Sequence, residues 1–411
     1  MKKVLFISYF FPPIRSDWRS LGFVKLLPEL GWQPIVISAA ESVSYGKDYS
    51  LLQQIPDGTE VHRVGHVEPS SEWGYARRKL RINYEFPDYY KSWYAPALRE
   101  ARKILQREKV DLIFSSSSPY TASFVAMALK KEFNIPWIAE FRDHWSGNDY
   151  LNLVYDKTVV EPLRKLQKFR IKRGERDIVN AANKTIVVSW HHREQLHEIH
   201  GVTKDKVEVI TNGYDESDFH ELTPRALYPD KLTTVFLGTA YPGSQEIAMN
   251  FVQAVNGIDK DAEVVFIGGA AEGKQSIHME NLTRIGYLMK AKGLALSSGC
   301  EFLLLITLPS AEWHIPMKIF DYLRIGKPIL AITAEYGDSA KIVKEAKAGF
   351  VLSHEQKKME EQLKIIFQKW RKGEFKDFHP DWEYVAQFER RNLTKRLADV
   401  FNEITANAKN K

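Results

Sequence analysis

A lysine and a carboxylate lie within one short apolar segment in the last quarter of the chain. The segment HIPMKIFDYLRIGKPILA spans residues 314–331, and its helical part is expected to begin at Pro316 and to end before Gly326. Lys318 and Asp321 are three positions apart, so they occupy neighbouring positions of one helix face. One interpretation is a surface ion pair between them, which would stabilise the helix by only about 0.2–0.5 kcal/mol.

The other interpretation is a binding site for a nucleoside diphosphate. Lys318 falls in the first turn of the expected helix, close to free backbone N–H groups and to the positive end of the helix dipole. A cation is unfavourable there unless an anion binds, and a diphosphate would satisfy both the helix terminus and the lysine. Asp321, one turn further on, is suited to accept hydrogen bonds from two adjacent ribose hydroxyls.

Two loops that contain glycine follow strand-like segments. LGTAYPG, residues 237–243, includes Gly238 and Thr239, where small residues would let backbone N–H groups approach a phosphate. A plain strand-to-helix turn is the alternative. GGAAEGKQ, residues 268–275, resembles a P-loop, but Gln275 stands where a magnesium-binding hydroxyl is required. This difference argues against nucleotide hydrolysis.

Strand-like and helical segments alternate along the chain, which favours an α/β protein with parallel sheets covered by helices. The pattern breaks at HELTPRALYPDK, residues 220–231, which is polar and contains two prolines, and this predicts a boundary between two Rossmann-like domains. Ligands bind beyond the carboxyl ends of the strands in such folds. The tail from about Trp382 to Ile404 predicts an amphipathic helix. The expected strands are residues 3–10, 33–38, 59–64, 111–117, 136–141, 185–190, 207–213, 233–239, 262–269, 281–288, 301–309, 328–332 and 348–353.

Length and composition narrow the class of protein. A chain of 411 residues is too long for one hydrophobic core and suits two domains. The single cysteine, Cys300, excludes an intramolecular disulfide and a cysteine-based zinc site, and it suits a reducing cytoplasm. Residues 1–13, MKKVLFISYFFPP, predict a buried strand rather than a signal peptide. No stretch reaches the roughly 20 apolar residues that a membrane span needs.

Basic residues gather in two runs, although the net charge is only +6. One run lies at residues 77–81, and the other, RKLQKFRIKRGER at residues 164–176, holds seven basic residues. A solvated helix face is the ordinary interpretation. The functional one is attraction to anionic lipid headgroups, which predicts a cytoplasmic protein peripheral to the inner membrane, or to a phosphorylated acceptor. No nucleic-acid-binding signature accompanies the charge, so no nucleic acid partner is expected.

Four histidines occur in WHHREQLHEIH, residues 190–200. No two of them are four positions apart on one helix face, and no cysteine joins them, so no metal site is expected. They are predicted to be surface residues.

Several motifs together resemble glycosyltransferase family 4, in the branch that builds bacterial cell-surface polysaccharides. The most specific is PMKIFDYLRIGKPIL, residues 316–330. The others are YFFPPIRSDWRS at 9–20, SSSSPYTA at 115–122, PWIAEFRDHW at 136–145 and VITNGYDESDF at 209–219. The resemblance extends over nearly the whole chain. It implies the GT-B fold, in which two Rossmann-like domains face each other across a cleft.

The resemblance implies an acceptor-binding domain at residues 1–222, a nucleotide-sugar-binding domain at 223–380, and a helix at 381–411 that packs back towards the first domain. It implies a retaining transfer of a sugar, without metal or cofactor, from a UDP- or GDP-linked donor to a hydroxyl of a glycan or lipid-linked acceptor. A nucleotide-sugar 2-epimerase on the same fold and a non-catalytic binding subunit are the alternatives.

Specific residues are implied for each role. Arg142, Asp143 and Lys318 are the implied catalytic residues, and the first two follow a strand at the place where many relatives have a histidine beside the donor sugar. A local salt bridge is the alternative for that pair. The implied donor-binding residues are Gly238, Thr239, Gly286, Tyr287, Glu312, Pro316, Lys318 and Asp321, and the acceptor or cleft residues are Pro13, Arg15, Arg19, Ser117, Ser189 and Asn212.

The sequence departs from the family pattern in three places. The family commonly has two glutamates. The corresponding positions of this sequence hold Trp313 and Asp321, and Glu312 lies beside the first of them. The basic pair that usually follows the first strand of the second domain is absent. The glycine pair of the first loop is also replaced. Arg15 or Arg19 is expected to supply, from across the cleft, the positive charge that the absent basic pair would carry.

Overall fold

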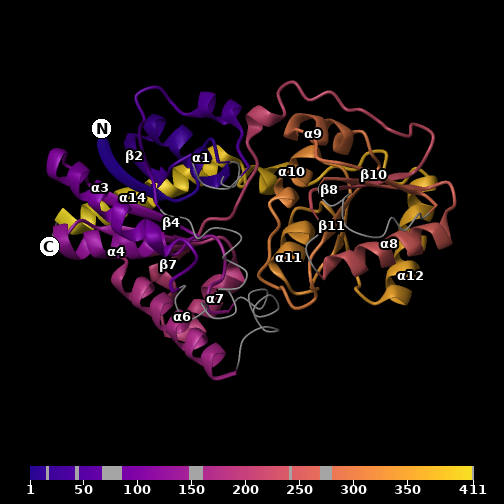
Figure 1. Ribbon diagram of the computed structural model, residues 1–411. Helices are drawn as coiled ribbons and strands as arrows, with labels where there is room; N and C mark the ends of the chain where they lie inside the picture. The colour runs from indigo at the N-terminus through magenta and orange to yellow at the C-terminus, as the bar shows by residue number, and fades with distance from the viewer. Residues whose placement is uncertain are drawn as a thin grey trace. The chain divides into compact units, whose positions relative to one another are not determined.

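The computed structural model describes residues 1–14, 18–41, 46–66, 86–147, 161–239, 243–268 and 280–409. These residues form two compact units, each an α/β structure with helices packed on a parallel sheet (Figure 1). The first unit comprises Met1–Thr211 together with Leu393–Lys411, and the second comprises Asn212–Asn392.

The first unit contains a seven-stranded sheet of order β3-β2-β1-β4-β5-β6-β7. Neighbouring strands pair in parallel, with Val4 of β1 opposite Pro34 of β2 on one side and Leu112 of β4 on the other. Parallel strands covered on both faces read as continuous apolar runs, and this is why the sequence predicts them well. The strands are β1 (Lys2–Ser8), β2 (Trp32–Ala39), β3 (Glu60–Val64), β4 (Leu112–Ser117), β5 (Trp137–Phe141), β6 (Lys184–Val187) and β7 (Val207–Val209).

Helices cover both faces of this sheet. The helices are α1 (Trp18–Leu26), α3 (Tyr94–Arg107), α4 (Thr121–Phe133), α6 (Glu161–Ala181), α7 (Trp190–His200) and α14 (Arg390–Lys409). The last of these, yellow in Figure 1, returns to the first unit from the end of the chain. Its Phe401 ring lies 5.2 Å from the ring of Trp32 and 5.5 Å from that of Phe114, measured between centroids.

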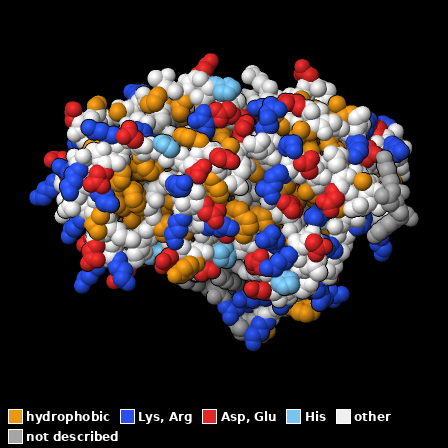
Figure 2. Space-filling view, turned by 180° about the vertical axis from the view of Figure 1, so that it is seen from behind, with side chains coloured by type: hydrophobic (Ala, Val, Ile, Leu, Met, Phe, Trp, Pro, Cys, Tyr) orange, Lys and Arg blue, Asp and Glu red, His pale blue; other side chains and the backbone are white. Residues whose placement is uncertain are grey.

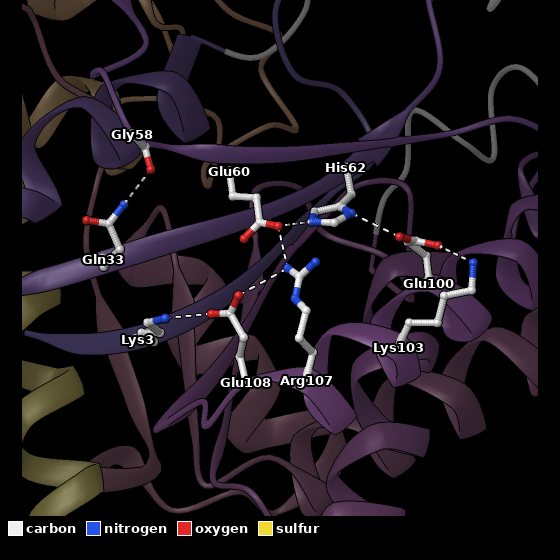
Figure 3. A network of polar contacts seen from close by, with 9 residues as sticks. All are labelled: Lys3, Gln33, Gly58, Glu60, His62, Glu100, Lys103, Arg107 and Glu108. Atoms are coloured by element: carbon white, nitrogen blue, oxygen red, sulfur yellow. Dashed lines mark hydrogen bonds and ion pairs between the residues drawn. The ribbon is translucent and has the colours of Figure 1, made fainter.

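Polar side chains tie the edge strand β3 to α3, as Figure 3 shows. His62 lies between the carboxylates of Glu60 and Glu100, with one ring nitrogen 2.9 Å from each. Arg107 of α3 also contacts Glu60. Because charged groups on an edge strand discourage pairing with another chain, this network both anchors and protects the edge.

The second unit contains a six-stranded parallel sheet of order β10-β9-β8-β11-β12-β13. Its strands are β8 (Thr233–Leu237), β9 (Glu263–Ile267), β10 (Leu282–Ile285), β11 (Phe302–Ile306), β12 (Ile329–Ile332) and β13 (Gly349–Leu352). Its helices are α8 (Ser244–Ile258), α9 (Lys290–Ser298), α10 (Lys318–Ile325), α11 (Asp338–Glu345), α12 (Gln356–Arg371) and α13 (Trp382–Ala386). Every strand expected from the sequence corresponds to a strand of one of the two sheets, so the prediction of an α/β fold with two Rossmann-like units is confirmed.

The compact units divide after Thr211, earlier than the boundary expected between residues 222 and 223. The segment that follows Thr211 is bound to the second unit, because Glu216 pairs with Arg324 at 2.5 Å. The expected tail helix is also divided into α13 and α14. Tyr214 pairs with the chain between them, accepting a hydrogen bond from the Arg390 amide at 2.8 Å and donating one to the Phe388 carbonyl at 3.2 Å.

Charged side chains of both signs are interspersed over the face of the molecule seen in Figure 2. Mixed signs of this kind are typical of an ordinary solvated surface. Within the described ranges, no helix is both long and apolar enough to cross a membrane.

Candidate functional site

The carboxyl ends of β8 and β9 meet at two glycines. Gly238 follows β8 with φ +106°, and Gly268 follows β9 with φ +129°. Residues with a Cβ rarely adopt these backbone angles. A Cβ added to Gly268 would stand only 2.8 Å from the carbonyl oxygen of Gly238. The two loops therefore approach through backbone alone, at the end of the sheet where α/β proteins bind ligands.

The helix α10 brings Lys318 to these glycines. Tyr322, one turn further along α10, is buried, and its hydroxyl accepts a hydrogen bond from the Leu237 amide at 2.8 Å, which fixes α10 against the end of β8. The Lys318 ammonium then lies 3.6 Å from the centroid of the Phe236 ring. It is also 3.2 Å from the point where a Cβ on Gly238 would stand. The expectation that Lys318 and Gly238 lie together agrees with this geometry.

Lys318 is a half-buried cation with no counter-ion among the described residues. Among the described residues no carboxylate forms an ion pair with it, and burial lowers its pKa to about 7. Burial and the nearby Lys318 lower the pKa of His314 to about 4. The cation–π contact with Phe236 stabilises the charge by roughly 0.5–2 kcal/mol, less than the hydration that burial removes. An anion bound beside Gly238 would supply the missing negative charge and raise the pKa of Lys318.

Asp321 pairs with Lys290, the first residue of α9, and not with Lys318. The Lys290 ammonium is 3.4 Å from Asp321 Oδ1 and 2.7 Å from Asp218 Oδ2. Burial raises the pKa of Asp321, while Lys290 opposes the rise. Burial alone would lower the pKa of Lys290, but the two carboxylates outweigh it and raise that pKa. The simple Lys318–Asp321 ion pair is therefore not the arrangement that the structure adopts.

The start of α10 differs from the expectation. The helix begins at Lys318 rather than near Pro316, and its first amides are already used. The Ile319 amide donates to the Pro316 carbonyl at 3.1 Å, and the Phe320 amide donates to that of Met317 at 3.2 Å. A bound phosphate would therefore find fewer backbone donors at this terminus than the sequence suggests.

The remaining expected donor residues line the same edge of the second sheet. Glu312 is exposed, and its carbonyl accepts a hydrogen bond from the Asp338 amide at 2.7 Å. Thr239 follows β8 and is exposed. Gly286 and Tyr287 follow β10, and the Tyr287 side chain is 62% exposed.

In the first unit, the expected catalytic pair follows β5. The Arg142 amide donates to the Ser117 carbonyl at 2.7 Å, and its guanidinium contacts the Ser118 carbonyl. Asp143 is exposed, and its backbone carbonyl accepts a hydrogen bond from the hydroxyl of Tyr120 at 2.8 Å. The loops after β4 and β5 are thus bound to each other, and the Ser118 hydroxyl also donates to Asp143 Oδ2 at 3.4 Å.

Arg19 was expected to contact a ligand, but the structure buries it. Only 2% of the residue is exposed, and its Nε donates to Glu140 Oε1 at 2.8 Å. Its other nitrogens donate to the carbonyls of Ile210, at 2.7 Å, and Thr211. Since a buried carboxylate needs its counter-ion, Arg19 serves the fold of the first unit and does not supply charge to a ligand. Arg15, the other candidate, lies outside the described residues.

Three other expected acceptor residues are buried in the first unit, Ser117 at the end of β4 and the other two outside the strands. Pro13 accepts a hydrogen bond from the Asp48 amide at 2.7 Å through its carbonyl. The Ser117 hydroxyl lies 2.6 Å from that of Ser123, and the Ser189 hydroxyl accepts a hydrogen bond from the His192 amide at 3.2 Å as the N-cap of α7. These side chains shape the loops in the structure. The last expected acceptor residue, Asn212, is the first residue of the second unit.

A buried histidine pair next to Asp143 was not found from the sequence. The rings of His144 and His192 stack with centroids 3.8 Å apart. Burial lowers the pKa of His144 to about 3 and that of His192 well below its ordinary value, so both are neutral. The prediction that the histidines of α7 lie on the surface is wrong for His192 and for His200, which pairs with Glu175 at 2.7 Å. Spacing along a helix could not reveal this, because the covering residues come from other elements.

Comparison with known proteins identifies the amino-terminal half. Residues 21–218 match the family model described as Glycosyltransferase Family 4. The chain is similar to family 4 over these residues. The resemblance drawn from the sequence motifs is confirmed there. No curated relative matches the sequence.

Solved structures share the fold over the whole chain. The structure of Anabaena Alr3699/HepE in complex with UDP and glucose is 14% identical, with a TM-score of 0.67 over 98% of this chain and 100% of that one. An alpha,alpha-trehalose 6-phosphate synthase from Burkholderia multivorans is 11% identical, with a TM-score of 0.64 over 100% and 98%. A putative UDP-N-acetylglucosamine 2-epimerase from Listeria monocytogenes is 11% identical, with a TM-score of 0.51 over 96% and 94%. The region similar to family 4 is thus part of a GT-B fold.

Among the described side chains, no group of three or more histidines, cysteines and acidic residues is arranged to hold a metal ion.

Proposed function

We propose that this protein is a retaining glycosyltransferase whose second unit binds a nucleotide-diphosphate sugar. The observation that carries the proposal is Lys318, a cation beside the backbone of Gly238 that has no counter-ion among the described residues. The similarity to family 4 and the GT-B fold support it. The relative from Anabaena was crystallised with UDP and glucose, which favours a UDP-linked donor here.

Each proposed residue has a physical task. When the bond between the sugar and the diphosphate breaks, negative charge develops on the leaving diphosphate, and Lys318 stabilises it. Asp321, held as a carboxylate by Lys290, accepts hydrogen bonds from the ribose. The acceptor hydroxyl forms its new bond on the same face of the sugar. Its proton passes to the leaving diphosphate or to the exposed carboxylate of Asp143.

The proposed acceptor is a glycan or lipid-linked hydroxyl used in bacterial surface polysaccharide synthesis. The motif resemblance to that branch of family 4 supports this choice, as do the basic residues of α6. Reaction without a metal at the cytoplasmic surface of the inner membrane is part of the same proposal.

A 2-epimerase is the second candidate, because a protein described as such shares the fold. The two functions differ in their products. An epimerase releases a free isomer of the nucleotide sugar without any acceptor, whereas a transferase needs an acceptor and releases the nucleotide diphosphate.

The first test is the thermal stability of the protein with UDP, GDP, ADP or CDP. We expect one nucleotide to raise the melting temperature of the wild type and to have much less effect on Lys318→Met and Asp321→Ala. Lys369→Met, which removes an exposed lysine from the last turn of α12, is the matched control and should respond like the wild type. If none of the four nucleotides stabilises the wild type, the donor site is refuted and a non-catalytic role becomes the better proposal.

A further inference from the structure

A cavity of about 820 Å³ lies on a helical face of the first unit. It is bordered by α4, which packs against both α3 and α6. Its volume falls within the roughly 300–1,000 Å³ of small-molecule sites. None of the residues with an implied role in sugar transfer lines it.

The helix α4 has apolar residues on two of its sides. One stripe packs against the sheet and is buried. It consists of Ala122, Val125, Ala126 and Leu129. The second stripe, Phe124, Met127 and Ala128, is only half-buried and lines the cavity. A helix on a protein surface ordinarily carries polar residues on its outer side, so this second, half-buried stripe favours an apolar ligand over it.

One end of the cavity is a fixed aromatic wall. Phe86 packs edge-on against Phe124, with ring centroids 5.5 Å apart, and stacks on Trp145 at 5.9 Å. Gly174 of α6 makes room for it, since a Cβ there would stand 2.8 Å from the Phe86 ring. A glycine inside a helix is unfavourable on its own account, so its presence here fits a requirement for close approach.

The charged residues in the described lining of the cavity are all lysines. Its described lining includes Lys91, Lys130 and Lys131 and no carboxylate. The Lys130 ammonium donates to Asn183 Oδ1 at 2.6 Å, and its pKa is lowered by burial and by the nearby Lys206. Lys131 is exposed and forms no ion pair or hydrogen bond with another described residue. An apolar cavity with this rim is complementary to an amphiphile with a negative headgroup.

The neighbouring helix α6 has the features of a lipid-facing helix. Its carboxyl end contributes Ala181 to the cavity. Further towards its start, Leu166 and Phe169 are 41% and 62% exposed within the basic run 164–176. Exposed apolar side chains among lysines and arginines are typical of helices that lie on anionic membranes.

We propose that this cavity binds an acyl chain of an anionic phospholipid. The acyl chain lies along the apolar stripe of α4 and ends against Phe86. The headgroup phosphate lies near Lys131 and Lys91. The residues 164–176 of α6 contact the surrounding lipid surface. This site is separate from sugar transfer and does not depend on the proposed donor.

The test is calorimetric titration of the purified full chain with monomeric lysophosphatidylglycerol, below its micellar concentration. The headgroup alone, glycerophosphoglycerol, and the zwitterionic lysophosphatidylcholine are the comparison probes. We expect one site for lysophosphatidylglycerol, with at least tenfold weaker binding of the headgroup and several-fold weaker binding of the zwitterionic lipid.

Variants separate the acyl chain from the charge. Ala128→Trp fills the cavity and should weaken lysophosphatidylglycerol at least tenfold, while Lys131→Met should weaken it several-fold and Lys369→Met should leave it unchanged. Met127→Asp makes the stripe polar. It is used in place of Ala128→Trp if the melting temperature of Ala128→Trp differs from that of the wild type. Unchanged affinity in a correctly folded cavity variant, or a headgroup that binds as tightly as the lipid, would overturn the proposal.

Discussion

Burial of the Lys318 charge destabilises the folded protein, and in the proposed donor site it favours binding of an anion. The Lys318 side chain is half-buried, and its ammonium lies over the ring of Phe236. A group whose charge is destabilised in the free protein gains the most when an anion arrives, so in the proposed donor site the binding energy would be concentrated on the diphosphate. Arg19 shows the opposite case, a buried cation whose charge is already satisfied by Glu140. The sequence does not show which of these two cations is paired with a carboxylate; only the three-dimensional surroundings of each side chain do.

The affinity for a nucleotide sugar is predicted to fall as pH rises. The pKa of Lys318 in the free protein is lowered to about 7, so the amine is charged at pH 6 and mostly neutral at pH 8. The bound diphosphate favours the charged form, and we expect binding at pH 8 to be about tenfold weaker than at pH 6. Nucleotide-sugar phosphates do not titrate in this range, so calorimetry with the nucleotide sugar isolates the lysine. Lys318→Arg keeps its charge, and a similar pH dependence in that variant would contradict the assignment.

Removal of the same charge is predicted to stabilise the free protein. The folded-state pKa of Lys318 lies below its unfolded value, so the charged form is penalised in full below about pH 7 and the penalty fades as pH rises towards the unfolded pKa. Lys318→Met should therefore increase the free energy of unfolding by about 1–3 kcal/mol at pH 6.5, and by much less at pH 10. Urea unfolding at the two pH values measures this. Lys369→Met should change little, and a destabilised Lys318→Met would show that the lysine contributes to packing instead.

At the scale of elements, α9 and α10 are joined by one lysine shared between two acids. Lys290 begins α9, Asp321 lies in α10, and Asp218 belongs to the segment just after Thr211. We predict that Lys290→Met weakens nucleotide binding about tenfold, because the buried Asp321 would then be protonated more readily and would accept fewer hydrogen bonds. The loss should be largest below pH 6. Lys290→Arg should restore binding.

The control for this prediction is Asp218→Asn. That change leaves Lys290 to pair with Asp321 alone, so nucleotide binding should be retained. If Asp218→Asn and Lys290→Met weaken binding equally, the lysine acts by holding the segment after Thr211 in place and not through Asp321.

Strands could be predicted from the sequence where the pattern of apolar residues that identifies them is local. Continuous apolar runs such as residues 301–309 identify strands buried on both faces, and both sheets follow from them. The partners of Arg19, Asp321 and His192 depend on segments far away in sequence, and no periodicity records them. The i,i+3 spacing of Lys318 and Asp321 even suggested the wrong pair, because Lys290 from another helix competes successfully for the carboxylate.

At the scale of the whole molecule, the end of the chain completes the core of the first unit. The second unit lies between the two parts of the first unit in sequence, and α14 returns to cover the face of the sheet near β1 and β4. Phe401 is fully buried there, beside Trp32 and Phe114. The fold of the first unit therefore depends on residues that follow the second unit in sequence.

Phe401→Ala is predicted to weaken the first unit and to spare the second. Loss of a buried phenylalanine costs about 3–5 kcal/mol, since apolar contacts are lost and a cavity remains. Hydrogen exchange should become faster at the amides of β1 and β4, while those of β8 and β11 keep their protection. Ile365→Ala removes an exposed apolar side chain from α12 and should leave both sheets unchanged. Equal loss of protection in both sheets would mean that the two units unfold as one, in which case α14 would stabilise the donor site as well as the first unit.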